Sequence, residues 1–266
     1  MSIDPSANIH ASAIVADGAR IGADVIIGAY CVIGPEVSIG AGTELKSHVC
    51  VDGITRIGAR NTIFPFASLG QQPQDMKFRG ERTVLEIGDG NAIREYVTMN
   101  PGTEGGGGVT RVGDDCLFMN HVHVGHDCIV GNGVIFANAA TLGGHVVVGD
   151  GAVLGGLSAI HQRCRIGEGA MIGGLAGVVA DVIPFGTVMG ERAKLQGLNL
   201  LGLKRRGVSK DQISALRAAY AELFAVGGTL KERRESVTEQ YGDNPLVQQI
   251  LAFIAEDTAR HLTTPD

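Results

Sequence analysis

Large side chains and positive charge are both scarce in this sequence. Its 266 residues include no Trp and only 5% aromatic residues, and the formal net charge is −6. A chain of this charge carries no overall positive field, which argues against nucleic acid or an anionic membrane as a partner. No stretch approaches the roughly 18 consecutive apolar residues that a membrane-spanning helix needs. The N-terminus also lacks the basic segment and apolar run of a signal peptide.

Cysteine is present, but its pattern argues against disulfides. Five cysteines are an odd number, and their spacing does not resemble that of a small disulfide-rich domain. Reduced thiols are typical of intracellular proteins, so the sequence predicts a cytoplasmic protein.

Glycine, by contrast, is abundant, and it accompanies a strict repeat of six residues. From Ile9 to Leu69 every sixth residue is aliphatic, and the step resumes at Ile87–Met99 and again from Val112 to Val178. Neither an α-helix nor an alternating strand generates a period of six. The pattern predicts short strands separated by corners, with three sides in each coil of 18 residues. Successive coils would lie about 4.8 Å apart and form a β-solenoid over residues 1–190. Four cysteines fall in the small interior position and are interpreted as structural: Cys31, Cys116, Cys128 and Cys164.

Two interruptions of the repeat predict loops at about residues 70–86 and 100–111. Binding groups are common on loops that a rigid scaffold supports. The first loop contains Asp75 and Lys77, and the second contains the run Gly105–Gly108. This glycine run does not resemble a phosphate-binding loop, so we interpret it as a mobile tip.

A helical domain is predicted over residues 191–266, where the six-residue step has ended. Ser209 with Gln212 and Thr229 with Glu232 have the spacing of capping boxes, and the pair Asn244-Pro245 is typical of a helix start. This domain would close the C-terminal end of the solenoid.

Histidines gather on one edge of the predicted solenoid. The 18-residue period places His126, His145 and His161 on three successive coils at nearly one angular position, with His123 close by. Histidine is the side chain best suited to accept a proton near neutral pH, so a general base is one interpretation. A zinc site with converging imidazoles is the other.

Several segments together resemble the UDP-N-acetylglucosamine 3-O-acyltransferase family. They are the segment from His121 to Cys128, the pairs Gly144-His145 and His161-Gln162, and the run from Gly197 to Gly207 with its Leu203-Lys204-Arg205-Arg206-Gly207 end. The resemblance covers essentially the whole chain. It implies a left-handed parallel β-helix, a homotrimer with sites between subunits, and no cofactor or metal. The implied reaction opens lipid A biosynthesis, a part of lipopolysaccharide synthesis. It transfers an (R)-3-hydroxyacyl chain from acyl carrier protein to the 3-hydroxyl of UDP-N-acetylglucosamine.

The resemblance also implies roles for individual residues. His126 would be the general base, Asp127 would assist it, and the Gly144 N–H would bind the oxyanion. Adjacent residues of a coil are expected to point apart, which bears on the role of Asp127. Gly174 would set acyl length and, being glycine, leave room for a chain of about fourteen carbons. Lys204, Arg205 and Arg206 would face the acidic carrier protein. The implied substrate-binding residues are Asp75, Lys77, Asn100, His123, His145, His161, Gln162, Asn199 and Arg205.

Two departures from the family pattern keep the acceptor open. Asn100 stands where the best-known members carry histidine, and Leu201 where they carry glutamate. Some members acylate a 3-amino sugar and form an amide. A γ-type zinc carbonic anhydrase, which uses the same kind of coil, and a non-catalytic scaffold are the remaining alternatives. A later N-acyltransferase of lipid A synthesis is disfavoured because the repeats begin by Ile9, which leaves no room for its N-terminal domain.

Overall fold

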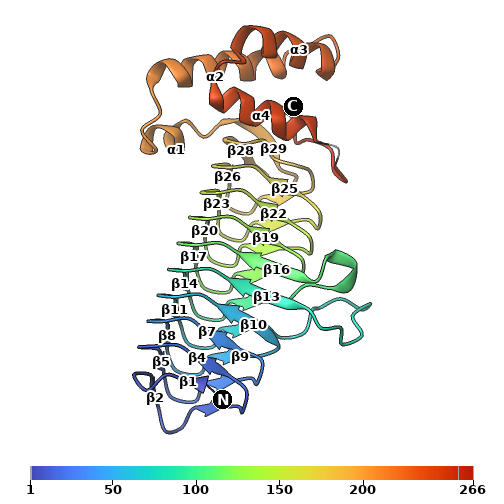
Figure 1. Ribbon diagram of the computed structural model, residues 1–266. Helices are drawn as coiled ribbons and strands as arrows, with labels where there is room; N and C mark the ends of the chain where they lie inside the picture. Colours follow the sequence, from blue (N-terminus) through green and yellow to red (C-terminus); the bar gives the residue numbers. More distant parts are fainter. Residues whose placement is uncertain (1, 257, 266) are drawn as a thin grey trace.

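The computed structural model describes residues 2–256 and 258–265 and has the predicted solenoid as its main body. Three sheets of nine, eleven and nine strands, parallel except for the last strand of the second, form the sides of a prism (Figure 1). The β-solenoid prediction is therefore confirmed.

The strands of each sheet recur once per coil. The first sheet contains β1 Ser2–Ile3, β4 Arg20–Ile21, β7 Ser38–Ile39, β10 Ile54–Ile57, β13 Val84–Ile87, β16 Val109–Val112, β19 Ile129–Val130, β22 Val147–Val148 and β25 Arg165–Ile166. The second contains β2 Asn8–Ile9, β5 Ile26–Ile27, β8 Glu44–Leu45, β11 Thr62–Ile63, β14 Ala92–Ile93, β17 Leu117–Phe118, β20 Ile135–Phe136, β23 Val153–Leu154, β26 Met171–Ile172, β28 Gly186–Met189 and β29 Lys194–Leu198. The third contains β3 Ile14–Val15, β6 Val32–Ile33, β9 Cys50–Val51, β12 Ser68–Leu69, β15 Thr98–Met99, β18 His123–Val124, β21 Thr141–Leu142, β24 Ala159–Ile160 and β27 Gly177–Val178.

The interior consists of the aliphatic residues of the six-residue step. In most two-residue strands the first side chain points outward and the second inward, so residues such as Ile33 and Leu69 are at most 1% exposed. Phe118 and Phe136 occupy the same position in successive coils and stack at 4.8 Å. All five cysteines are free, and the four predicted interior ones are buried. Burial raises the pKa of Cys116 and Cys164 to about 11 and that of Cys128 to about 12.

Three kinds of corner join the sheets, and each has its own chemistry. The loop corner joins the third sheet to the first and carries both loops, residues 70–83 and 100–108. The ring corner joins the second sheet to the third, and at it Tyr30, His48, Phe66, Tyr96 and His121 form a continuous stack with ring centroids 4.8–5.1 Å apart. The Asp/Asn corner joins the first sheet to the second.

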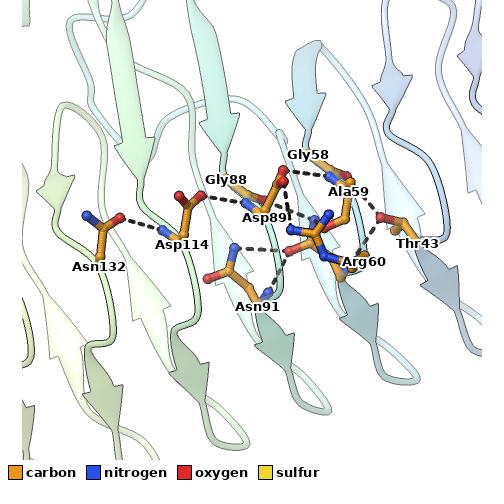
Figure 2. Close-up of polar contacts among 10 residues, drawn as sticks. Thr43, Gly58, Ala59, Arg60, Gly88, Asp89, Asn91, Asp114 and Asn132 are labelled. Carbon is orange, nitrogen blue, oxygen red and sulfur yellow. Dashed lines mark hydrogen bonds and ion pairs between the residues drawn. The ribbon is translucent and has the colours of Figure 1, made fainter.

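Side chains at the Asp/Asn corner hydrogen-bond from coil to coil (Figure 2). Asp89 accepts the Ala59 N–H at 2.8 Å, Asp114 accepts the Asp89 N–H at 2.7 Å, and Asn132 accepts the Asp114 N–H at 2.8 Å. Asn91, buried just inside, donates to Asn61 Oδ1 at 3.0 Å and accepts the Cys116 N–H at 2.8 Å. Turn amides that the sheets leave unpaired are satisfied in this way.

The C-terminal region covers the last coil with four helices. They are α1 Leu200–Arg205, α2 Lys210–Leu223, α3 Leu230–Tyr241 and α4 Pro245–Ala255 (Figure 1). Both predicted capping boxes are present, and Pro245 opens α4. Two elements here were not predicted: α1, and β29, which pairs antiparallel with β28. Within the described residues, no helix has the length and apolar character needed to cross a bilayer.

The Asn91 bonds predict a specific loss of stability. In Asn91→Ala the buried Cys116 N–H loses its acceptor, which we expect to lower the free energy of unfolding by about 1–3 kcal/mol. The matched control is Arg60→Ala, which removes an exposed ion pair with Asp89 at the same corner and should cost less than about 1 kcal/mol. Urea unfolding at one protein concentration measures both. Equal losses would contradict the role assigned to Asn91.

Candidate active site

A histidine–carboxylate pair lies at the loop corner between β18 and β19. His126 Nδ1 is 2.7 Å from Asp127 Oδ2. The expectation that adjacent residues point apart is wrong here, because Asp127 has a left-handed backbone with φ of 60°. This conformation, which Asp tolerates better than most residues, turns its side chain back toward His126.

The Asp127 carboxylate is held by a network of donors. Its side chain is 1% exposed, and it accepts the Thr103 N–H at 2.7 Å and the Thr103 hydroxyl at 2.6 Å. The Asp127 N–H in turn donates to Thr110 Oγ1. A carboxylate only accepts hydrogen bonds, so His126 Nδ1 carries the proton and Nε2 keeps its lone pair. His126 Nε2 is therefore available to accept a proton.

The second loop closes over this pair. The glycine run was interpreted as a mobile tip, but Glu104–Gly106 instead forms a 3-10 turn packed on Asp127. A Cβ at Gly106 would lie 2.0 Å from Asp127 Cγ, whereas a Cβ at Gly105 would meet nothing within 4 Å. Gly106 is thus required for the close approach of the loop.

Gly144 lies beneath His126 on the next coil, because the strands before them pair His123 with Thr141. A Cβ on Gly144 would lie 2.6 Å from His126 Nε2, so the imidazole occupies the space that a side chain would fill. None of the hydrogen bonds found among the described residues uses the Gly144 N–H. That donor is available beside the base.

Two further histidines have lowered pKa values. Burial lowers the pKa of His123, with His126 adding to the effect, and His123 Nδ1 lies 2.8 Å from Thr98 Oγ1. Burial also lowers the pKa of His145, although Asp127 Oδ2, 3.7 Å away, opposes this. The His145 ring meets that of His126 edge-on with centroids 5.0 Å apart. The lowered pKa values favour the neutral form of both imidazoles near His126.

The residues that could hold a zinc ion differ from the three converging imidazoles that were expected. In the described part of the chain, the group that could hold a metal consists of His126, Asp127 and His145, with ligand atoms within 4.8 Å of one another. His161, the expected third imidazole, is not among them. His126 Nδ1 and both carboxylate oxygens already take part in hydrogen bonds. The donors fit a proton-transfer pair better than a metal.

A cavity of about 310 Å³ opens between the two loops and His145. The predicted Asp75 and Lys77 line it, and the Lys77 N–H holds the pKa of the Asp75 carboxyl below its usual range. Sequence reasoning missed the other six lining residues, Phe78, Glu81, Thr103, Glu104, Gly105 and Arg163. Arg163 falls one coil after His145, so the period could have found it, but nothing marks the loop residues in advance.

The other predicted site residues lie in three different settings. His161 and Gln162 are exposed at the same corner, one coil beyond Gly144 and His145, and Asn100 is buried with its Oδ1 unpartnered. Three residues lie elsewhere or are already engaged. Gly174 is at the ring corner, Asn199 caps α1 and bonds Gly169 O, and Arg206 pairs with Glu168. Lys204 and Arg205 are exposed on α1.

Family models match both parts of the chain. The model described as Udp N-acetylglucosamine O-acyltransferase, Domain 2, matches residues 181–263. The model described as Bacterial transferase hexapeptide (six repeats) matches residues 18–53 and 110–144.

Whole-chain relatives agree with these models. The chain is 59% identical over 256 residues to the acyl-(acyl-carrier-protein)–UDP-N-acetylglucosamine O-acyltransferase of Rickettsia africae, covering 96% of this chain and 97% of the relative. The enzyme of that name from Rickettsia rickettsii is 60% identical over the same shares. Among solved structures, LpxA of Acinetobacter baumannii is 42% identical with a TM-score of 0.92, covering 96% of this chain and 99% of its own. The UDP-N-acetylglucosamine acyltransferase of Campylobacter jejuni is 38% identical with a TM-score of 0.91, covering 97% and 100%.

The lowered pKa of His123 predicts how stability depends on pH. As the pH falls below about 6.5, the unfolded chain takes up a proton at this residue before the folded protein does. The folded protein therefore becomes less stable as the pH is lowered. His123→Gln should reduce that loss between pH 7.5 and 5.5, measured as the change in melting temperature. His10→Gln, at an exposed position, is the control and should follow the original protein. Parallel curves for all three proteins would contradict the prediction.

Proposed function

This chain belongs to the acyl-(acyl-carrier-protein)–UDP-N-acetylglucosamine O-acyltransferase family, and we propose that His126 is the general base of its reaction. The protein transfers an acyl chain from acyl carrier protein to UDP-N-acetylglucosamine, the first step of lipid A biosynthesis. The observation that supports the role of His126 is its 2.7 Å contact with the buried Asp127 carboxylate. The acceptor atom, the sugar 3-hydroxyl, and the (R)-3-hydroxyacyl donor are part of the proposal.

The reaction follows from the orientation of the pair. His126 Nε2 removes the proton from the 3-hydroxyl as its oxygen attacks the thioester carbonyl, and Asp127 stabilises the resulting imidazolium. The negative oxygen of the tetrahedral intermediate accepts the Gly144 N–H. When the C–S bond breaks, the imidazolium returns its proton to the carrier thiolate. The products are the 3-O-acyl sugar nucleotide and the free thiol of the carrier.

The substrate site surrounds this pair. We propose that the sugar nucleotide occupies the cavity of Asp75, Lys77 and His145, with His123 and Gln162 around it. Asn199, held at the Asp/Asn corner by its bond to Gly169 O, would contact it from a second copy of the chain. The buried Asn100 Oδ1 has no partner among the described residues, so it is available to accept a bond from the sugar. Arg205, exposed on α1, is assigned to a phosphate, for which a guanidinium is well suited.

A single assay tests the function and the base together. Purified protein with EDTA, (R)-3-hydroxymyristoyl-acyl carrier protein and UDP-N-acetylglucosamine should form an acylated sugar nucleotide. His126→Ala should reduce the rate by about 10²–10⁴-fold, the usual contribution of general-base catalysis. Activity that required a divalent metal would indicate a metal at His126, Asp127 and His145 instead, and an unchanged rate in the variant would remove His126 from the mechanism. Donors of different length test Gly174 as the length-setting position, and the 3-amino sugar tests ester against amide formation.

The packing of Gly106 predicts a second kinetic effect. In Gly106→Ala the new methyl group would displace either the loop or Asp127, and a shift of about 1 Å in a catalytic group can cost roughly 10²-fold in rate. Gly105→Ala is the matched control, since its Cβ would enter open space one residue away. Comparable kcat values for the two variants would show that the loop does not position Asp127.

We assign carrier docking to a basic groove on the helical domain. Lys204, Lys210 and Arg217 surround an apolar cavity of about 320 Å³ floored by Val208 and Ile213. Arg206, part of the predicted patch, already pairs with Glu168 and is assigned to packing. An acidic carrier would be attracted to this groove with a strength that salt weakens.

Charge reversal in this groove tests the assignment. Arg217→Glu should raise the KM for the acyl carrier protein about tenfold at low salt and leave the KM for UDP-N-acetylglucosamine unchanged, because only the carrier contacts the groove. Lys231→Glu, on the exposed face of α3, is the control. Equal effects of the two reversals would place the carrier elsewhere.

We also propose a homotrimer in the cytoplasm. The ring corner exposes Tyr30, Phe66 and Tyr96, and Leu157 and Leu175 continue this apolar edge past Gly174. His126 and Gly174 lie at opposite edges of the third sheet, so a site between two copies would bring them together. Sedimentation equilibrium should give three chains, and a monomer would exclude this arrangement.

Five free cysteines support a reducing compartment, which cell fractionation tests.

A further inference from the structure

The segment that follows α4 returns to the solenoid and lies against its last coils. This tail, residues 258–265, pairs with Asp181 through a parallel bridge to Leu262. The Asp181 N–H donates to His261 O at 2.8 Å, and the Thr263 N–H donates to Asp181 O at 2.7 Å. The backbone bonds fix the tail beside the coil that carries His161 and Gln162.

A buried carboxylate strengthens this attachment. Asp181 is fully buried and accepts Arg165 Nε at 2.8 Å and the Thr258 hydroxyl at 3.0 Å. Arg165 also donates to Phe253 O at the end of α4 and lies 4.0 Å over the Phe253 ring. Asp181 therefore holds the tail through both its backbone and its side chain.

Arg260 is the tail residue that reaches the site. Its Nε and one terminal nitrogen lie 3.2 and 3.0 Å from Gln162 O, and the same terminal nitrogen lies 2.7 Å from His161 Nδ1. Sequence separations of 98 and 99 residues put these contacts beyond any repeat-based prediction.

These contacts decide the tautomer of His161. A guanidinium only donates, so at 2.7 Å His161 Nδ1 must accept, and the ring proton lies on Nε2. The ring could otherwise donate from Nδ1 to its neighbour Gln162 O, 3.2 Å away. That contact is longer, and Gln162 O already receives two N–H groups from Arg260. The arginine therefore leaves His161 with an Nε2–H directed away from the tail.

We propose that Arg260 is a positioning residue, which holds His161 as the Nε2–H tautomer so that it donates to an oxygen of the bound sugar nucleotide. This inference rests on the proposed function and on the expected contact of His161, one coil beyond His145 at the same corner, with the substrate. The guanidinium of Arg260 and that of Arg163, which is exposed on the same corner, put two positive charges beside His161, and these would attract an anionic group of the substrate. The groove assigned to the carrier is on a different element, α2 with the end of α1.

Nitrogen NMR of histidine-labelled protein tests the tautomer without any assay of activity. In the original protein the His161 resonances should report a proton on Nε2 alone. In Arg260→Ala they should report a mixture of both tautomers, and in Arg260→Lys, which retains a donor, the Nε2–H form should persist in part. An unchanged His161 tautomer in Arg260→Ala would overturn the proposal.

A double-mutant cycle separates positioning from a general effect on the tail. Arg260→Ala should raise the KM for UDP-N-acetylglucosamine about tenfold, the equivalent of one hydrogen bond of about 1.4 kcal/mol, with little change in the KM for the acyl carrier protein. In a His161→Ala background the same change should cost less than about twofold, because a residue that acts through His161 has nothing left to position.

A control variant in the tail and the melting temperatures separate the effect on His161 from misfolding. Thr264→Ala, an exposed tail position, should leave both constants unchanged, and melting temperatures identify any variant that fails to fold. Additive effects of Arg260→Ala and His161→Ala would contradict the proposal. Failure of the original protein to acylate either sugar would instead remove the proposed function, while the NMR result would still stand.

Discussion

Backbone hydrogen bonding between coils is the constraint on which the rest of this molecule depends. Each coil pairs with the next through two-residue strands, so every strand position must keep its register and its inward aliphatic side chain. Only the corners are free to vary. Each corner has its own side chains: the Asp/Asn corner is hydrogen-bonded from coil to coil, the ring corner carries stacked rings, and the loop corner carries both loops and the His126–Asp127 pair. The chemistry is a local modification of an otherwise uniform scaffold.

The sequence predicted what periodicity controls. It located the buried residues of the six-residue step and the corner that His126 and His145 share. Capping boxes at Ser209 and Thr229 identified two helices, because those side chains satisfy backbone donors within one turn. These features could be predicted from the sequence because each depends on residues that are close together in the chain or separated by a fixed step.

What the sequence could not predict depends on single backbone angles or on distant contacts. The period fixes an angular position on the coil but not the direction of a side chain, so it could not show that Asp127 turns back to His126. The period also placed His161 in one stack with His126 and His145, whereas its ring contacts Arg260. Thr103 and Arg260 reach the site from an insertion and from the tail, outside the repeat altogether.

The small interior position filled by cysteine has a chemical consequence. Oxidation and alkylation of cysteine proceed through the thiolate, and with pKa values of about 11 to 12 Cys116, Cys128 and Cys164 are almost wholly protonated at neutral pH. Burial also keeps peroxides and electrophiles away from the sulfur atoms. The solenoid therefore uses a reactive amino acid as a buried, protonated filler of its core.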